Sequence, residues 1–252
     1  MLKYGFIPVW KRNRDVFIKL FWVNFLLPLL EPLFYIFAFG YGLGAFVKEI
    51  DGLPYKVFIT PAIISMAVLN SSFFYTTYSS FVKMIFQKTF DAIIVTPVSI
   101  EDVVIGEILW GTTRGVISGL IVMLLFLILG LINFFHLLIF IPIIVILSFT
   151  FSSLGMFFTS TVKNIEYFNF PIFLYFTPMM FFSGTFFPLK NISERILFVA
   201  KIVFPLSFSV DALRSSYINF SIDKFLLGFI PVIHGFLFFF LSIKIMSKKL
   251  IK

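Results

Sequence analysis

The stretch LLIFIPIIVILSFTFSSLGMFFTST, residues 137–161, contains no charged side chain and is long enough to cross a lipid bilayer as a helix. A helix rises about 1.5 Å per residue, so about 20 apolar residues cross a hydrocarbon core of about 30 Å. Apolar segments of this length recur along the chain. The 252 residues are 60% hydrophobic and 13% charged, whereas soluble domains are about 45–50% apolar and about 25% charged. We therefore predict an all-α integral membrane protein and exclude a water-soluble fold.

The apolar runs define six candidate transmembrane helices, preceded by an amphipathic segment. We place the spans at about 22–46, 58–82, 108–131, 137–161, 168–183 and 225–245. Residues 4–20 mix basic side chains with aromatic and aliphatic ones, which is typical of a helix that lies in the membrane interface. The first run is longer than a signal-peptide core and lacks a small-x-small cleavage site, so we expect it to be retained. The chain, residues 1–252, would then form a single membrane domain.

Basic side chains gather at the two ends of the chain. Lys11 and Arg12 precede the first span, and Lys248 and Lys249 follow the last. Such flanks stay in the cytoplasm, and an even number of spans puts both termini on one side. We therefore expect both termini to be cytoplasmic, although the segment 184–224, which would lie outside, also carries basic residues. Anchoring at the lipid surface explains the net charge of +8, so we expect no nucleic acid partner.

The stretch FFSGTFFPLKN, residues 181–191, interrupts the fifth apolar run with Gly184 and Pro188. Apolar stretches resume after this turn, and Pro205 divides them into two pieces. A turn at membrane depth needs protein or a water-filled cavity around it to satisfy its backbone groups. We therefore predict that residues 184–224 form a re-entrant helical hairpin at the outer face.

Polar side chains within this outer region have specific expected roles. Ser193 is placed to cap the first short helix and Ser207 the second. Asp211 and Arg214 are three residues apart in the second helix, and we expect a local ion pair between them. The alternative is two independently solvated charges.

The second span contains an unusually polar run, NSSFFYTTYSS, residues 70–80. Ser72, Thr76 and Ser79 share one helical face, so they are candidates to line a route for an amphiphile. The alternative is hydrogen bonding between helices, which is common for polar side chains in lipid.

Glu31 lies before Pro32 inside the first span, and a carboxylate within a membrane suggests a function because it is costly to bury. Pro32 removes a backbone donor and loosens the helix, so a structural role for Glu31, satisfied by water or a neighbouring cation, is the favoured interpretation. Glu107 and Arg114 are seven residues apart on one helix face near the expected cytoplasmic boundary, where arginine can extend to the interface. They are weaker candidates for a pathway.

Glycine recurs every four residues at Gly111, Gly115 and Gly119, and again at Gly40 and Gly44. Small residues at this spacing allow helices to approach closely in a membrane. We interpret these glycines as packing positions rather than as hinges.

The sequence shows no catalytic or metal-binding motif. It has no cysteine, and neither His136 nor His234 belongs to an HExxH pattern. It also contains no G-x-x-x-x-G-K-[ST] phosphate loop and no G-x-S-x-G nucleophile motif. We therefore expect no catalytic, cofactor or metal site in this chain, and any ATP must be bound by another protein.

Residues 83–107 form the longest expected cytoplasmic connection and mix apolar with charged side chains. Thr96 and Pro97 divide it into two short helical pieces. A connection of this kind can dock on a partner protein. The alternative is a simple interfacial connector.

Four stretches carry a family resemblance, in the same order as in that family: EPLFYIFAFGYGLGAF, FDAIIVTPVSIEDVVIGEIL, FFSGTFFPLKNI and PLSFSVDALRSSY. They begin at residues 31, 90, 181 and 205, and the likeness extends over nearly the whole chain. With them the chain resembles the membrane subunit of type-2 ABC exporters, which include drug, nodulation-factor and polysaccharide permeases. The third and fourth stretches together are the most specific part of the resemblance.

The resemblance implies a half-permease in a prokaryotic cell membrane. A second permease copy, most simply in a homodimer, would pair with two separate ABC ATPase subunits, which would bind ATP and Mg. The amphipathic amino-terminal segment would act as the connecting helix at the inner surface. The family's ATPase contact falls on Phe90 to Asp102 of this sequence, with the side chains Phe90, Ile94, Thr96, Pro97 and Val98.

These features favour a permease subunit for a hydrophobic or lipid-linked substrate. A membrane-embedded lipid-modifying enzyme is an alternative, but it should show acids or histidines that converge at the membrane surface. An autonomous channel or secondary transporter is another, for which inverted repeats are expected. Neither signature is visible in the sequence.

Overall fold

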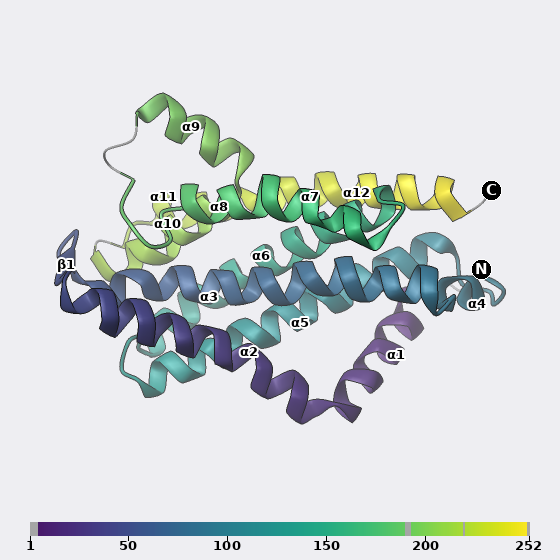
Figure 1. Cartoon of the computed structure of the whole chain (residues 1–252), viewed down its shortest axis with the longest axis horizontal. Coiled ribbons are helices and arrows are strands. Elements are labelled where there is room, and N and C mark those ends of the chain that lie inside the picture. The colour runs from purple at the N-terminus through teal and green to yellow at the C-terminus, as the bar shows by residue number, and fades with distance from the viewer. Residues whose placement is uncertain (1–4, 190–192, 219, 251–252) are drawn as a thin grey trace.

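The structure is a computed structural model that describes residues 5–189, 193–218 and 220–250. These residues are helical apart from a short antiparallel hairpin of β1 (Glu49–Ile50) and β2 (Leu53–Pro54) (Figure 1). The α-helices are α1 (Phe6–Lys19), α2 (Phe21–Tyr35), α3 (Tyr55–Phe74), α4 (Thr89–Ile94), α5 (Ile100–Ile128), α6 (Phe134–Thr161), α7 (Asn169–Pro171), α8 (Thr177–Phe182), α9 (Glu194–Val203), α10 (Leu206–Ile218), α11 (Ile222–Leu227) and α12 (Pro231–Leu250).

Several spans continue through turns that are not α-helical. The π-helical segment Ile36–Gly42 and the 3-10 turn Leu43–Ala45 extend α2, and the π-helical segments Tyr75–Ser79 and Val82–Phe86 extend α3. A further 3-10 turn, Ile165–Phe168, precedes α7, and the π-helical segment Ile172–Phe176 separates α7 from α8. A π-helical turn bonds residue i to i+5 instead of i+4, so it widens the helix without ending it.

Five helical stretches of the described residues are long and apolar enough to cross a membrane. They are Phe21–Ala45, Tyr55–Phe86, Ile100–Ile128, Phe134–Thr161 and Ile222–Leu250. The sixth candidate is the pair α9 and α10, which bends by 105°. The segment expected at 168–183 consists of the short pieces from Ile165 to Phe182 and is not one of the five. An all-helical membrane fold with a bent, re-entrant-like pair after the fifth apolar run is therefore confirmed.

Helix α3 lies at the centre of the bundle, between α2 and α6, and α5 packs along it (Figure 1). The α4 end of the bundle also holds the carboxyl end of α12, because Lys249 Nζ donates to the carbonyl oxygens of Val162 at 2.8 Å and Thr159 at 3.3 Å. The opposite end carries the β1–β2 hairpin and α10 (Figure 1). The start of α1 and the end of α12 therefore lie at the same end of the molecule (Figure 1).

The glycine spacing on α5 marks close helix packing, as the sequence indicated, whereas a Cβ atom on Gly44 would meet nothing closer than 3.8 Å. A Cβ atom on Gly119 would lie 2.7 Å from Val68 on α3, and one on Gly115 would lie 3.0 Å from the Cβ atoms of both Ser72 and Ser148. Real Cβ atoms do not approach other atoms closer than about 3 Å. Helices α3, α5 and α6 therefore touch along the glycine face of α5, and a larger residue there would separate them.

We expect Gly115→Leu to lower the stability of the folded protein by about 1–3 kcal/mol, because overpacking a close interface forces backbone shifts. The matched control is Gly42→Leu, where the added Cβ would meet only the Phe37 carbonyl oxygen at 3.8 Å on an exposed surface. Thermal unfolding of the detergent-solubilised variants measures both. Equal unfolding temperatures for the two variants would contradict the packing role.

The hairpin of α9 and α10 is held by contacts that differ from those expected. Ser193 is the residue before α9 but makes no capping hydrogen bond, and Ser207 lies inside α10, where it bonds back to Phe204. The expected ion pair between Asp211 and Arg214 is wrong: Asp211 accepts from Lys201 of α9 at 2.6 Å. An ion pair across the bend between α9 and α10 replaces the local one.

Arg214 instead ties α10 to the rest of the bundle. Its Nη2 donates to the Gly184 carbonyl oxygen at 2.8 Å, its Nε donates to the Phe58 carbonyl oxygen at 3.3 Å, and its guanidinium lies 3.8 Å from the centre of the Phe58 ring. Gly184 has a φ of +63°, which glycine adopts without steric cost. Arg214 thus holds the predicted turn against α3. Pro188 lies in the exposed part of this turn, and Pro205 is buried between α9 and α10.

We expect Arg214→Gln to cost about 1.5–3 kcal/mol of stability, because it removes charge-assisted hydrogen bonds from a side chain that is only 9% exposed. Lys201→Gln breaks a pair between partly exposed side chains and should cost at most about 1 kcal/mol. Unfolding temperatures of the two variants, measured in the same detergent, give the comparison. A larger loss for Lys201→Gln would show that the exposed pair holds the hairpin.

Candidate functional site

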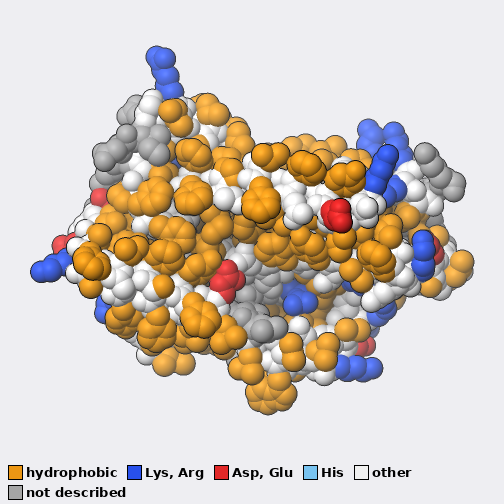
Figure 2. Space-filling model, in the orientation of Figure 1, with side chains coloured by type: hydrophobic (Ala, Val, Ile, Leu, Met, Phe, Trp, Pro, Cys, Tyr) orange, Lys and Arg blue, Asp and Glu red, His pale blue; other side chains and the backbone are white. Residues whose placement is uncertain are grey.

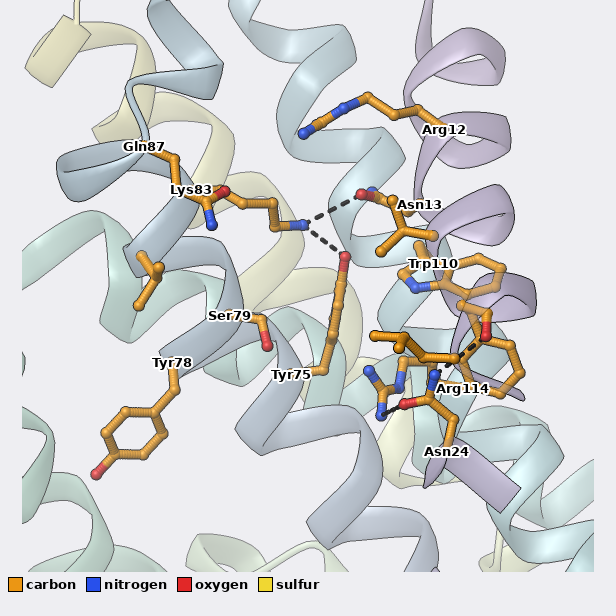
Figure 3. A pocket seen from close by; sticks show the side chains of 14 residues that line it. Arg12, Asn13, Asn24, Tyr75, Tyr78, Ser79, Lys83, Gln87, Trp110 and Arg114 are labelled. Atoms are coloured by element: carbon orange, nitrogen blue, oxygen red, sulfur yellow. Dashed lines mark hydrogen bonds between the residues drawn. The ribbon is translucent and has the colours of Figure 1, made fainter. Parts of the chain in front are cut away.

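A cavity of about 540 Å³ lies between α1, the π-helical extension of α3 and α5 (Figure 3). Its wall consists of side chains from these elements and from the start of α2: Arg12, Asn13, Val16, Phe17, Leu20, Asn24, Tyr75, Tyr78, Ser79, Val82, Lys83, Gln87, Trp110 and Arg114. Polar and apolar side chains are mixed in this wall: the Arg114 guanidinium lies 5.5 Å from the centre of the Phe17 ring. The cavity lies toward the end of the bundle that carries α4.

Helix α1 closes the cavity because it packs along the first half of α5. Val9 fits against Gly106, where a Cβ atom would lie 2.6 Å from the valine. The indole Nε1 of Trp10 donates to Thr113 Oγ1 at 3.0 Å, and its ring meets Trp110 edge to face at 5.5 Å. The amphipathic segment predicted from the sequence is therefore a helix from Phe6, docked by one face; residues 1–4 lie outside the described part.

Lys83, which lines the cavity, forms a buried ion pair with Glu107 behind the wall. Glu107 is fully buried on α5, and its carboxylate also accepts hydrogen bonds from Asn13 at 2.9 Å, Ser80 at 2.9 Å and Tyr75 at 3.1 Å. A carboxylate without water around it is stable only when it is paired and fully hydrogen-bonded. These bonds join α1, the extension of α3 and α5 through a single group.

Lys83 donates hydrogen bonds to two of the residues that also bond to Glu107. Its ammonium donates to the Tyr75 hydroxyl at 2.6 Å and to Asn13 Oδ1 at 3.3 Å, as the dashed lines in Figure 3 show. The π-helical segments carry Tyr75 and Lys83 toward α5, and such turns occur frequently at functional sites. The ammonium is therefore placed by three elements at once.

Two further cations reach the cavity and are incompletely bonded. The Nη1 atom of Arg12 and the Nε atom of Arg114 are buried, and each lacks a hydrogen-bond partner among the described residues. Arg114 Nη2 contacts Asn24 Oδ1 at 3.5 Å, and its guanidinium lies 5.1 Å from the centre of the Tyr75 ring. The wall of the cavity therefore has an excess of positive charge.

A second, smaller cavity of about 180 Å³ continues from the first, because Asn24 and Arg114 line both. Its wall includes Glu31 of α2 and Asn70 of α3. The amide of Asn70 lies 2.9 Å from each carboxylate oxygen of Glu31. The exposed carboxylate of Glu31 thus has a specific partner. Together the two cavities form a polar track along α2, α3 and α5.

The structure separates the candidate pathway residues into two groups. Ser72 and Thr76 are fully buried between helices and donate to the carbonyl oxygens of Val68 and Ser72 one turn earlier. They do not line the cavity, so helix packing is their role within this chain. Ser79 does line it, and Glu31 lines the smaller cavity.

Lys83 and Arg12 were not singled out in the sequence as candidates. Lys83 was assigned to a connecting loop, and Arg12 was interpreted as a membrane anchor. The expected connection 83–107 is shorter in the structure, because helical turns continue to Phe86 and α5 begins at Ile100. The one signal in the sequence that points to this pair is a lysine near the end of an apolar helix with no acidic residue close by. The sequence does not identify its partner, because Glu107 lies on another helix.

The connection between Phe86 and α5 contains α4 and then a turn around Thr96 and Pro97. Phe90 is fully buried, Val98 is 8% exposed and Ile94 is half-buried, so Phe90 and Val98 cannot present a surface to a partner as expected. Thr96 and Pro97 are exposed. Val95, which the sequence did not single out, is 87% exposed.

The buried side of this connection belongs to an apolar cluster that also underlies the cavity. Phe90 of α4 and Val98 pack in the same cluster as Phe81 and Met84 of the α3 extension and Val9 of α1. The side chain of Ser99 caps α5 in a reciprocal pair with Asp102. The connection is thus firmly attached to the helices that hold Lys83 and Glu107.

Comparison with known proteins identifies related chains. Residues 6–218 match the family model described as "ABC-2 type transporter". "Nodulation protein J" of Rhizobium meliloti is 34% identical over 211 residues, which is 84% of this chain and 80% of the relative. "Nodulation protein J" of Bradyrhizobium diazoefficiens is 28% identical over 250 residues, with 99% and 95% covered. "Inner membrane transport permease YadH" of Escherichia coli is 28% identical over 115 residues, covering 45% of this chain and 44% of the relative.

Proposed function

The chain belongs to the ABC-2 type transporter family and is a multi-pass membrane permease, and on this premise we propose that it exports a hydrophobic or lipid-linked substrate. Drugs, lipids, glycolipids and polysaccharides attached to a lipid are the substrate classes. Transport would be driven by ATP hydrolysis on separate subunits, because the sequence contains no phosphate loop. We place the permease in the membrane with both termini and α4 facing the cytoplasm and with α9 and α10 on the outer side.

The observation that carries the proposal is the cavity between α1, the α3 extension and α5. Its wall offers the polar groups of Arg12, Lys83 and Arg114 and the apolar side chains of Val16, Phe17 and Leu20. Binding sites for small molecules combine an apolar wall with a few placed polar groups. A cavity of this composition fits an amphiphile better than an inorganic ion or a sugar alone.

The working transporter would contain two permease copies and two ABC ATPase subunits. ATP and Mg would bind to the ATPase, which would contact the exposed surface around Val95, Thr96 and Pro97. Motion at this surface would reach the cavity directly, because Phe90 and Met84 belong to one apolar cluster. This motion would open the cavity alternately to the two sides of the membrane. Such alternating access requires rigid elements that move as units, and the apolar cluster would provide one.

The test is reconstitution of the permease with an ABC ATPase from the same genome in proteoliposomes. We expect a mixture of membrane-extracted amphiphiles to stimulate ATP hydrolysis and to accumulate on one side of the membrane only when ATP is present. Flux without ATP would favour a channel or secondary transporter. Chemical modification of the added lipid, without movement, would favour a membrane-embedded enzyme.

A further inference from the structure

We infer that the cavity between α1, the α3 extension and α5 binds the anionic headgroup of an amphiphile: a phosphate, sulfate or carboxylate attached to an apolar chain. This inference deepens the proposed function and, as regards the transported substrate, rests on it. Binding itself is a property of the permease alone and is measured without the ATPase.

The charges around the cavity do not balance. Its wall contains Arg12, Lys83 and Arg114 and no carboxylate. Glu107, behind the wall, pairs with Lys83 and satisfies that cation. Two guanidinium groups are left at the edge of a membrane domain, where an uncompensated charge is costly and a counter-ion is strongly favoured.

Two guanidinium groups of the cavity wall have unfilled hydrogen-bond donors. Buried N–H groups normally have partners, so an unsatisfied one calls for a ligand or for water. Arg12 and Arg114 each keep a buried nitrogen without a partner in the described part of the chain, and they approach from α1 and α5, on two sides of the cavity (Figure 3). Guanidinium groups hold phosphate and carboxylate oxygens through short, charge-assisted hydrogen bonds.

The apolar side chains in the cavity wall indicate that the ligand also carries an apolar chain. Val16 and Leu20, which line the cavity, are 53% and 55% exposed, so the wall continues onto the outer surface of the molecule. Figure 2 shows a hollow in the otherwise hydrophobic face, with Lys or Arg side chains visible inside it. A chain attached to the bound headgroup would leave through this side toward the lipid. A free inorganic anion would leave the apolar wall uncovered.

The smaller cavity limits the number of anionic groups that the ligand can carry. Glu31 faces it, and Asn24 and Arg114 connect it to the larger cavity. A second anionic group would be repelled from the Glu31 side, because like charges in a low-dielectric site destabilise each other. The site therefore fits one anionic group beside Arg12 or beside Arg114, with neutral polar groups extending toward Asn70.

The experiment measures binding of dodecyl phosphate to the purified permease in nanodiscs of phosphatidylcholine. We expect saturable binding to the wild type, and Arg12→Gln plus Arg114→Gln together should weaken it at least about tenfold, the effect of losing one charge-assisted hydrogen bond. Arg14→Gln is the matched control. Arg14 is on the same helix, is paired with Asp15 and does not line the cavity, so binding should stay within about twofold.

Folding is checked separately. Arg12→Lys with Arg114→Lys keeps both charges and should retain most of the binding lost in the glutamine pair, provided that unfolding temperatures are similar. Wild-type affinity in the correctly folded glutamine pair would overturn the site. Equal binding of dodecyltrimethylammonium would overturn its anion selectivity.

Three arms identify the source of the anion. Inorganic phosphate that binds as tightly as dodecyl phosphate would overturn the amphiphile and leave a free phosphate site. Displacement of dodecyl phosphate by phosphatidylglycerol in the nanodisc would support the site with a membrane lipid as its ligand; failure to displace it would support a cargo molecule. If binding requires Arg12 and Arg114 but no amphiphile is transported with the ATPase, the site stands and the export function fails.

Discussion

Lys83→Met should lower the free energy of unfolding by about 3–5 kcal/mol, because it leaves the Glu107 carboxylate buried without its cation. Glu107 is fully buried, so its carboxylate depends on the groups packed around it. The remaining hydrogen bonds from Asn13, Ser80 and Tyr75 would hold a carboxylate with no opposite charge beside it. The amount of monodisperse protein after heating in detergent is the measurement.

The double variant Lys83→Met with Glu107→Leu separates charge from packing. Replacing both partners of a buried ion pair with apolar groups is often nearly neutral, so we expect most of the lost stability to return. The matched single change Ser80→Ala removes one neutral donor from the same carboxylate and should cost only about 1 kcal/mol. A double variant as unstable as Lys83→Met alone would show that the charge imbalance is not the cause.

Val95→Asp should weaken binding of the partner ATPase by roughly 100-fold, or about 3 kcal/mol, because a carboxylate would be buried without a partner in the proposed interface. The permease itself should remain stable, since Val95 is 87% exposed and its side chain is not part of the core. Co-purification with the ATPase and the stimulation of ATP hydrolysis by the permease provide two independent measurements.

Tyr167→Asp is the matched control for this change. Tyr167 is 50% exposed and lies in the turn that follows α6, at the same end of the molecule as α4. We expect it to leave ATPase binding within about threefold, as usual for a surface change outside the interface. Substitutions at Phe90 or Val98 do not test the same contact, because both side chains are buried in the permease. Wild-type assembly and coupling in folded Val95→Asp would remove this surface from the proposed contact.

The sequence by itself determined that the chain lies in a lipid bilayer and how it divides into helices. Long apolar runs can satisfy their backbone groups in lipid only as helices, so their length and position indicate the spans before any contact is known. The same reasoning found the turn at Gly184 and the bend at Pro205, because both depend on local backbone properties. The glycine face of α5 was also predictable, since its spacing follows the helical period.

The tertiary structure decided which polar groups meet. Asp211 pairs with the partly exposed Lys201 across a bend, and the buried Glu107 pairs with Lys83 from another helix, because a charge is stabilised by the opposite charge nearest in space rather than by the nearest in sequence. Burial likewise separated Ser79 from Ser72, although the two share one helix face. Neither choice is encoded in spacing along the chain, because each depends on how neighbouring helices are rotated and offset against one another.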